Sequence, residues 1–263
     1  MTYLQDILSS STAPLDGAVR CADFSQDGQN LVLGGDFTHY AKLYTVSGSS
    51  VIYTDDVPSQ NGTQHYLDGA VNAAKFTIGS FVGGGVNLII GGQFTGYAKY
   101  YHIESHDTIT YLEDFTKSAN APLTSAIRDI AVTYGYCVLC SDYDSGLWGL
   151  YADQVIMQEL FRQVYGTEYD AVLTADFSDA ASSRDAYLAL ATTDGVGLFE
   201  YGIGGWDLIA ELTSRDLPNY NPVAVSLQYC DLGSKRYLLV AGQHSTTSAY
   251  PYNIQSFIWQ YSI

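Results

Sequence analysis

The sequence predicts an all-β protein that is built from repeated four-stranded units. Three observations support this prediction. Short apolar runs recur at even spacing and are separated by turns of Gly, Ser, Asp and Pro. No segment carries a convincing helical period. Tyrosine is abundant, at 23 of 263 residues, and aromatic side chains suit the half-buried surfaces of strands.

Internal repeats define the units. The segment TYLQDILSSSTAPLDGAVR, which begins at Thr2, aligns without gaps with TYLEDFTKSANAPLTSAIR, which begins at Thr110. A second pair is NLVLGGDFTHYAKLYTV from Asn30 and NLIIGGQFTGYAKYYHI from Asn87. Matching segments at a fixed spacing are typical of repeat architectures. Following this spacing along the chain gives five units.

Each unit opens with a β-branched residue after a turn, and this residue starts the first strand. The predicted first strands are VRCADF, VNAAKF, IRDIAV, VLTADF and VAVSLQY, beginning at Val19, Val71, Ile127, Val172 and Val223. The second strands read NLVLGG, NLIIGG, YCVLCS, YLALAT and YLLVAG. The third strands end on an aromatic residue and read YAKLY, YAKYY, LWGLY, GLFEY and FIWQY. Four fourth strands follow, namely VIYTDD, TITYLED, VIMQELF and DLIAEL.

The fifth unit lacks a fourth strand after its third, because the sequence ends at Ile263. A matching strand is found at the other end, where TYLQDIL resembles the fourth strand of the second unit. We expect residues 2–8 to complete the last sheet and close a ring, which reduces the number of unprotected edges. The sequence thus predicts one domain, a five-bladed β-propeller with blades at residues 19–56, 71–115, 127–161, 172–212 and 223–263 plus 2–8.

Two units resemble WD40-type blades. In the unit that begins at Val19, the likeness lies in Phe-Ser-x-Asp-Gly at the first turn, a pair of small residues, an Asp in the second turn and a closing aromatic. The unit that begins at Val172 is the second match. No Gly-His precedes the blades, and the only Trp-Asp, Trp206-Asp207, starts a fourth strand. The chain is therefore similar to divergent WD40-like repeat proteins.

The resemblance implies that one face of the disc is built from the loops before each first strand and between the second and third strands. We call this the loop face. Its loops are rich in Tyr, Asn, Ser and His, and exposed Tyr on rigid loops is a common recognition surface. The expected binding residues are Asp36, His39, Tyr40, His65, Gln93, Tyr97, Asp144, Asp194, His244 and Tyr250. The alternative for the polar residues of the second-to-third-strand turns is that each caps its own turn.

The repeated segment carries two structural expectations. Gly34 and Gly35 relieve crowding where the ring narrows. Lys42 and Lys99 pair across strands with acidic neighbours, and such a pair contributes only a few tenths of a kcal/mol when it is exposed.

The composition argues against several partners. The formal charge of −17 arises because Lys and Arg are scarce, at 11 residues together. A chain this negative is repelled by phosphate backbones and anionic lipid, so we expect no nucleic-acid or membrane partner, and a basic protein surface instead. No apolar run of about 18 residues and no signal peptide is present, which favours a cytoplasmic protein. The sequon at Asn61 would matter only in the alternative, extracellular case.

Residues for catalysis or metal binding are not evident. No G-x-S-x-G elbow, Walker loop or H-E-x-x-H appears, and no cofactor or metal is expected. Carboxylates around a channel would suit a glycosidase, and the candidates in the first strands are Asp23, Asp129 and Asp176. The four cysteines are expected to be reduced core thiols, with Cys137 and Cys140 on opposite faces of one strand.

The sequence therefore predicts a non-enzymatic interaction or scaffold module, which presents its loop face to a protein partner within a homo- or hetero-oligomeric assembly. The alternative is an extracellular carbohydrate-binding or structural propeller, and a glycosidase is the third interpretation. Unequal loops favour the scaffold, because a lectin would show a similar aromatic pocket in each blade.

Overall fold

The structure, a computed structural model of the chain, describes residue 7 and residues 14–57, 67–78, 85–104, 108–117, 121–150, 155–160, 172–178, 186–192, 195–202, 205–213, 222–232, 235–245 and 254–262. These residues form strands, turns and bends, and none of them lies in a helix. Within these ranges there is consequently no helix that could cross a membrane. The predicted all-β fold class is confirmed.

Four sheets each contain four antiparallel strands in chain order. The first sheet holds β1 (Val19–Phe24), β2 (Asn30–Gly35), β3 (Ala41–Ser47) and β4 (Ser50–Asp56). The second holds β5 (Val71–Phe76), β6 (Val86–Gly92), β7 (Ala98–Glu104) and β8 (Thr108–Asp114). The third holds β11 (Ile127–Thr133), β12 (Tyr136–Ser141), β13 (Gly146–Leu150) and β14 (Val155–Leu160). The fourth holds β15 (Val172–Phe177), β16 (Tyr187–Thr192), β17 (Gly195–Gly202) and β18 (Gly205–Thr213).

A fifth sheet has three described strands, β19 (Pro222–Leu232), β20 (Lys235–Ser245) and β21 (Ile254–Ser262). The predicted order of four consecutive strands is thus confirmed in the first four sheets, and β1, β5, β11 and β15 begin at the predicted residues. A short hairpin of β9 (Thr116–Lys117) and β10 (Ala121–Pro122) was not predicted. Strands of two residues leave no periodic pattern in a sequence.

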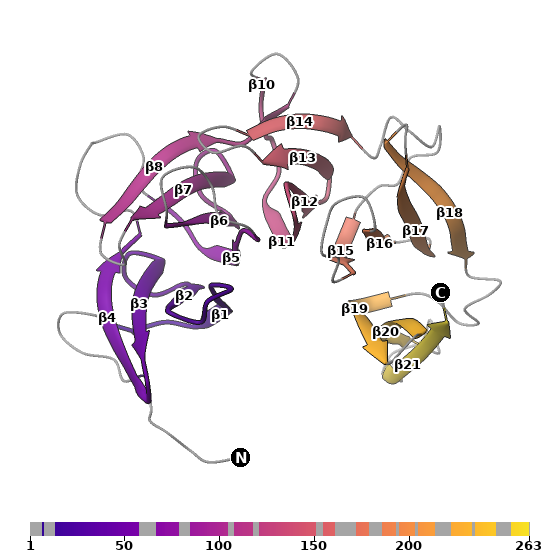
Figure 1. Cartoon of the computed structure of the whole chain (residues 1–263), viewed down its shortest axis with the longest axis horizontal. Helices are drawn as coiled ribbons and strands as arrows, with labels where there is room; N and C mark the ends of the chain where they lie inside the picture. The colour runs from indigo at the N-terminus through magenta and orange to yellow at the C-terminus, as the bar shows by residue number, and fades with distance from the viewer. Residues whose placement is uncertain are drawn as a thin grey trace.

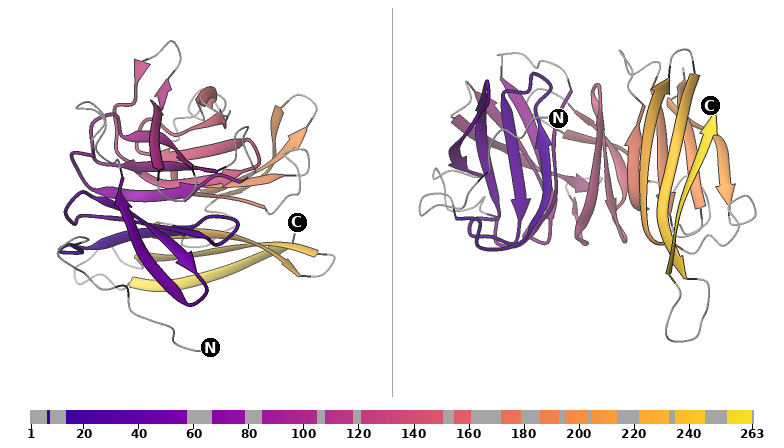
Figure 2. Two further views of the ribbon diagram at one scale, coloured as in Figure 1. Left: turned by 60° about the vertical axis from the view of Figure 1, so that its left-hand side comes forward. Right: turned by 90° about the horizontal axis from the view of Figure 1, so that it is seen from below.

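The five sheets are arranged in an arc, with β1, β5, β11, β15 and β19 nearest the centre and β4, β8, β14 and β18 on the outside (Figure 1). Each inner strand contacts the next inner strand along the arc. Seen from below, the sheets stand side by side (Figure 2). This is a propeller-like arrangement. The described first and fifth sheets do not meet, and the predicted closing strand, residues 2–8, lies outside the described residues except for Ile7.

Apolar side chains fill the spaces between consecutive sheets. Leu43 of β3 packs with Val71 and Phe76 of β5 between the first two sheets, and all three are buried. Cys137 belongs to the core between the second and third sheets, whereas Cys140 belongs to the core between the third and fourth. The prediction that these thiols lie on opposite faces of a strand is confirmed. Both are free, and burial raises the pKa of each thiol.

The glycine pairs mark places where neighbouring sheets approach closely. A Cβ atom on Gly34 would lie 2.4 Å from Cγ1 of Val71, and one on Gly91 would lie 2.6 Å from Cγ2 of Ile127. A side chain at either position would therefore push the next sheet away. The expectation that Gly34 relieves crowding is confirmed, and Gly91 has the same role one sheet further along.

Candidate functional site

The loops of the first two sheets are held by the same two-point contact. Asp16, in the loop before β1, accepts hydrogen bonds from the amide of Thr38 (2.7 Å) and from its hydroxyl (2.6 Å). Asp68 binds Thr95 in the same way, at 2.7 and 2.6 Å. These hydrogen bonds lower the pKa of both carboxyl groups. Each contact ties the loop before a first strand to the turn between the second and third strands.

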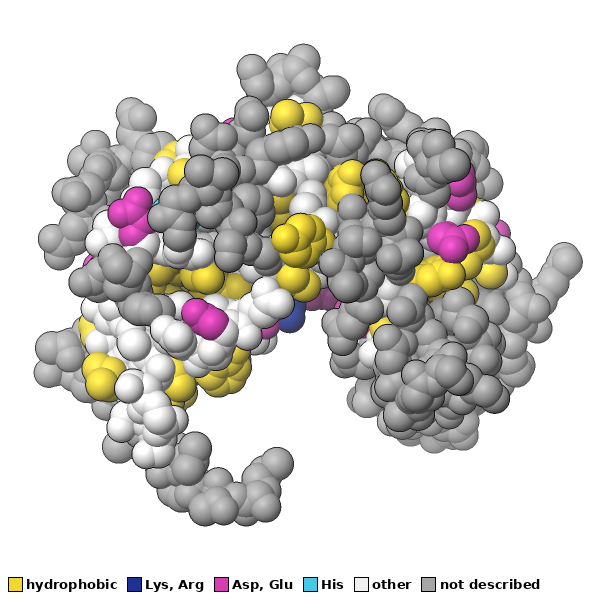
Figure 3. Space-filling view, in the orientation of Figure 1, with side chains coloured by type: hydrophobic (Ala, Val, Ile, Leu, Met, Phe, Trp, Pro, Cys, Tyr) yellow, Lys and Arg dark blue, Asp and Glu magenta, His cyan; other side chains and the backbone are white. Residues whose placement is uncertain are grey.

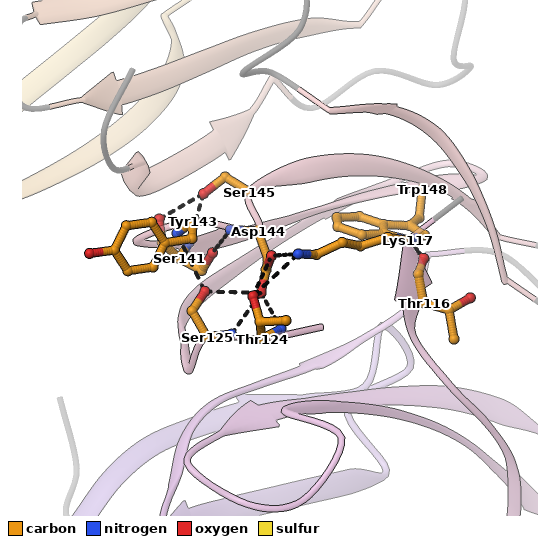
Figure 4. A network of polar contacts seen from close by, with 9 residues as sticks. All are labelled: Thr116, Lys117, Thr124, Ser125, Ser141, Tyr143, Asp144, Ser145 and Trp148. Carbon is orange, nitrogen blue, oxygen red and sulfur yellow. Dashed lines mark hydrogen bonds and ion pairs between the residues drawn. The ribbon is translucent and has the colours of Figure 1, made fainter. Parts of the chain in front are cut away.

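The third sheet reverses this contact. Asp144 follows β12 and takes the place of Thr38, while Thr124 takes the place of Asp16 (Figure 4). The carboxylate of Asp144 accepts hydrogen bonds from the amide of Thr124 and from the amide of Ser125, the latter at 2.6 Å. Asp144 is fully buried and forms an ion pair with Lys117. Burial alone would raise the pKa of Asp144, but the hydrogen bonds from Lys117, Thr124 and Ser125 lower it.

Tyr143 is the exposed aromatic residue of this network. The first residue of the inner strand pairs with Gly35, Gly92 and Ser141 in the first three sheets, so these three residues are equivalent. The aromatic residues two positions later are therefore equivalent too, and they are Phe37, Phe94 and Tyr143. Phe37 and Phe94 are buried, with 1% and 2% exposure, whereas Tyr143 is 67% exposed. Its amide donates a hydrogen bond to Oγ of Ser125 (3.3 Å), and its ring points away from the network (Figure 4).

The difference at Tyr143 has two local causes. In the first two sheets a buried lysine ammonium lies over the phenylalanine ring, Lys42 at 5.6 Å from the centre of Phe37 and Lys99 at 5.9 Å from that of Phe94. The third sheet has Gly146 in the position of these lysines. Lys42 pairs with Leu33 and Lys99 pairs with Ile90. The equivalent residue of the third sheet is Leu139, and it pairs with Gly146. The turn of the third sheet is also shorter. Its aromatic residue is thus not held inside.

An ion pair involves the residue that precedes Tyr143 in the chain. Nη2 of Arg128 contacts both carboxylate oxygens of Asp142, at 2.6 and 2.7 Å, and the two side chains are 46% and 41% exposed. The equivalent pair in the first sheet is Arg20 with Asp36. Arg20 also donates from Nη1 to Asn72 of the second sheet, at 2.9 Å. The fourth sheet lies next to Arg128 as the second lies next to Arg20, and its residue equivalent to Asn72 is Leu173. The side chain of Leu173 cannot accept a hydrogen bond.

The predicted binding residues that the structure describes make separate contacts. Asp36 contacts Arg20, Gln93 is exposed, and His39 is 63% exposed with Nδ1 2.5 Å from Oδ2 of Asp56. Tyr40 and Tyr97 are half-buried against neighbouring apolar cores, and each has a left-handed φ of 59°. His65, Asp194 and Tyr250 lie outside the described residues, and His244 lies in β20 without a described side chain.

Two interpretations of the turns are corrected. Asp144 does not reach the loop face, because Lys117 and the amides of Thr124 and Ser125 hold its carboxylate inside. Asp36 and Asp144 also do not cap their own turns, since Asp36 contacts β1 and Asp144 contacts the preceding loop. The equivalent of Asp36 in the third sheet is Asp142, because Gly35 and Ser141 hold equivalent register positions.

The lysines of the repeated segment pair with carboxylates as predicted, but they are not exposed. Lys42 is 0% exposed and lies 2.7 Å from Oδ1 of Asp56, and Lys99 lies 2.7 Å from Oδ1 of Asp114. The rings of Phe37 and Tyr53 flank the Lys42 ammonium. Phenylalanine on one side and tyrosine on the other cover the lysine side chains, whereas Asp56 and Asp114 keep 20% and 40% of their side chains exposed. The sequence pattern did not indicate this burial of the lysines.

Charged residues also line the inner edge of the arc. Asp23 accepts a hydrogen bond from the amide of Phe76 (2.8 Å), and Asp176 accepts one from the amide of Tyr229 (2.7 Å). The two aspartates thus make the same tie to the next sheet, as expected for repeat geometry. Lys75 lies 3.2 Å from Asp23, and Figure 3 shows basic and acidic side chains at the margin of the central hollow.

Asp129 differs from the other two inner aspartates, because it receives its hydrogen bond from the hydroxyl of Thr174 and not from an amide of the next sheet. The pKa of Asp176 is raised to about 6, mainly by burial and in small part by nearby Asp129, against the lowering effect of the hydrogen bonds from backbone amides. In the described part of the chain, no three His, Cys, Asp or Glu side chains are grouped in a way that could hold a metal ion.

Comparisons with known proteins show the fold. No protein-family model matches the chain, and no curated protein matches its sequence. An ancestral GH74 enzyme resembles it with a TM-score of 0.59 and 12% identity, over 94% of this chain and 34% of that chain. A lectin from Aleuria aurantia in complex with alpha-methyl-L-fucoside has a TM-score of 0.46 and 13% identity, over 86% and 72% of the two chains. A protein from Lactobacillus plantarum has a TM-score of 0.49 and 10% identity, over 89% and 70%.

The chain spans about a third of the GH74 protein's length, and these likenesses concern the fold alone. They do not single out the WD40 family. The likeness to a GH74 enzyme contradicts the prediction that the protein is not an enzyme, since an enzyme uses this fold and missing sequence motifs gave no ground for excluding catalysis. The chain has an all-β, propeller-like fold with several four-stranded antiparallel sheets.

Proposed function

We propose that the protein is a carbohydrate-binding propeller and that Tyr143 is the centre of its binding surface. The observation that carries this proposal is the exposure of Tyr143, 67%, at a position whose equivalents in two other sheets are buried. An exposed aromatic ring offers a flat apolar surface on which the C–H groups of a sugar ring pack. The hydrogen bonds that Asp144 and Ser125 accept hold the backbone of this turn, so little conformational entropy is lost on binding.

The charge of the protein supports an uncharged ligand. With a formal charge of −17, the chain repels polyanions and gains nothing from steering them. A neutral sugar meets no such repulsion, and its hydroxyl groups match the polar residues beside Tyr143. Binding of this kind fits a protein that acts outside the cytoplasm, where the sequon at Asn61 would also be used.

We propose one WD40-like ring of five blades, closed by residues 2–8 in the fifth sheet. Ile7 and Leu15 pack against Leu31, Leu33, Phe37 and Tyr44 of the first sheet. Their equivalents in the aligned repeat, Phe115 and Leu123, pack against the third sheet directly after the fourth strand of the second. Ile7 therefore follows the path of a residue that leaves a fourth strand.

The carbohydrate proposal is tested by glycan-array binding of the wild-type protein and the Tyr143→Ala variant. We expect binding to a subset of neutral glycans and its loss in the variant. Tyr134→Ala is the matched control, because Tyr134 is 49% exposed in the turn at the opposite end of the same sheet. The proposal fails if no glycan binds, or if Tyr143→Ala binds as tightly as the wild type.

A protein partner with a basic surface is the second candidate. It is favoured by exposed apolar residues on the outermost strands, which include Ile52 of β4 (58%), Ile156 of β14 (44%) and Ile209 of β18 (45%). Apolar side chains on edge strands invite pairing with another chain. Affinity purification from the native source, with Ile52→Lys as the comparison, tests this candidate. A partner that the wild type and Ile52→Lys retain equally would not bind the outermost strand of the first sheet.

A further inference from the structure

We propose that Arg128 and Asp142 select neutral sugars with adjacent hydroxyl groups and reject acidic sugars at the Tyr143 surface. This inference rests on the proposed carbohydrate binding and concerns the same site. Asp142 precedes Tyr143 in the turn after β12, and Arg128 holds the Asp142 carboxylate with Nη2. The pair is thus anchored at the residue that directly precedes Tyr143 in the chain.

The comparison with the first sheet shows that Arg128 has donors to spare. Arg20 uses Nε and Nη2 on Asp36 and Nη1 on Asn72, so all three nitrogens are occupied. Arg128 uses only Nη2, and within the described ranges its Nε and Nη1 have no hydrogen-bond partner. A guanidinium group presents five N–H donors in a fixed plane. The third sheet therefore offers N–H groups that the first sheet uses for its own structure.

The chemistry of the pair matches hydroxyl groups. Each sugar hydroxyl is both a donor and an acceptor, so one hydroxyl accepts from Arg128 while its neighbour donates to a remaining lone pair of Asp142. The two opposite charges cancel, and a neutral ligand therefore loses little solvation energy of its own. A sugar carboxylate would instead meet the Asp142 carboxylate and the negative field of the whole chain.

The equivalent turns of the first and second sheets do not combine an exposed aromatic ring with an arginine that has spare donors. The first sheet has a buried Phe37, and each of the three nitrogens of its Arg20 already holds a partner. The second sheet has Asn72 in the place of the arginine and a buried Phe94. Among these three equivalent positions, an exposed ring and an arginine with spare donors coincide only in the third sheet.

The test uses isothermal titration of the full chain with neutral trisaccharides of glucose, galactose and mannose and with their uronic acid counterparts. Wild-type protein should bind at least one neutral trisaccharide, and at least about tenfold more tightly than its acidic counterpart, as the loss of one charged hydrogen bond implies. Arg128→Gln should lose about tenfold of the neutral affinity. Asp142→Asn should reverse the preference towards the acidic sugar, and this gain should fade as salt is added.

Arg20→Gln is the matched control, because it breaks the equivalent pair far from Tyr143 and should leave sugar binding unchanged. Thermal unfolding of each variant confirms that it is folded before binding is compared. If no trisaccharide binds the wild type, the proposed function itself fails. If sugars bind in a Tyr143-dependent manner but acidic and neutral forms bind equally, or if Arg128→Gln binds as the wild type does, the selectivity inference alone is overturned.

Discussion

Replacing Asp176 by asparagine should stabilise the protein at neutral pH. Asp176 lies on the inner strand β15, half-buried, and accepts the amide hydrogen of Tyr229 from the next sheet. Burial raises the pKa of its carboxyl group to about 6, so keeping it ionised at neutral pH costs free energy. Asparagine keeps an oxygen that accepts the same hydrogen bond and removes the charge.

The sign and size follow from the difference between the folded and unfolded pKa. Because the pKa of Asp176 is higher in the folded protein than in the unfolded chain, proton binding by Asp176 stabilises the fold at low pH. This contribution is complete below the ordinary pKa of 3.8 and is lost as the pH rises through about 6. The difference corresponds to about 3 kcal/mol, and partial exposure of the side chain reduces this to about 1–3 kcal/mol. Asp176→Asn should therefore raise the free energy of unfolding by about 1–3 kcal/mol at pH 7.5 and by about half as much at pH 5.

Urea unfolding of the wild type and the variant at pH 7.5, 6 and 5 measures this gain. Lower pH is avoided, because the pI is about 4.3 and proteins precipitate near zero net charge. Asp23→Asn is the control, since Asp23 makes the same tie to the next sheet but also pairs with Lys75 at 3.2 Å. The reasoning is refuted if Asp176→Asn brings no gain at pH 7.5, or if the control gains equally.

Three further predictions concern the sheets and their contacts. Thr124→Asp should destabilise the protein by about 3 kcal/mol, because a second carboxylate then meets the buried carboxylate of Asp144. Adding Asp144→Thr should recover part of this loss, because it restores the arrangement of the first two sheets. A double-mutant cycle in urea measures the recovery, and additive losses would contradict it. Gly91→Ala should cost about 1–3 kcal/mol, since its Cβ would meet Ile127, and an unchanged unfolding midpoint would show that the sheets can separate freely. Deleting residues 2–8 should lower the Tm by about 5 °C or more, and an unchanged Tm would count against ring closure.

The strand pattern could be predicted because each strand is a short apolar run between turns, and the repeats aligned these runs with one another. Val19, Val71, Ile127 and Val172 begin inner strands as the alignment indicated. Repetition fixes position along the chain well, because every unit must bury the same faces. Closure of the ring stays a prediction, because it depends on contacts between the two ends of the chain and residues 2–8 lie outside the described residues except for Ile7.

The candidate site was less accessible to sequence reasoning. The segments GGDFT, GGQFT and CSDYD align when Gly35, Gly92 and Ser141 are matched, and this places Tyr143 opposite two phenylalanines. The alignment alone does not show which aromatic ring is exposed. That outcome depends on Gly146, which replaces a buried lysine, and on Lys117, which reaches Asp144 from another strand. Such tertiary partners leave no periodic signal.

The two buried lysines make the protein suited to chemical footprinting. An amine-reactive reagent cannot reach Lys42 or Lys99 while their ammonium groups are enclosed by aromatic rings and paired with Asp56 and Asp114. Modification of Lys42 then requires the first sheet to open, and modification of Lys99 requires the second to open. Because the two side chains belong to adjacent sheets, their labelling rates would report whether neighbouring sheets open together or one at a time.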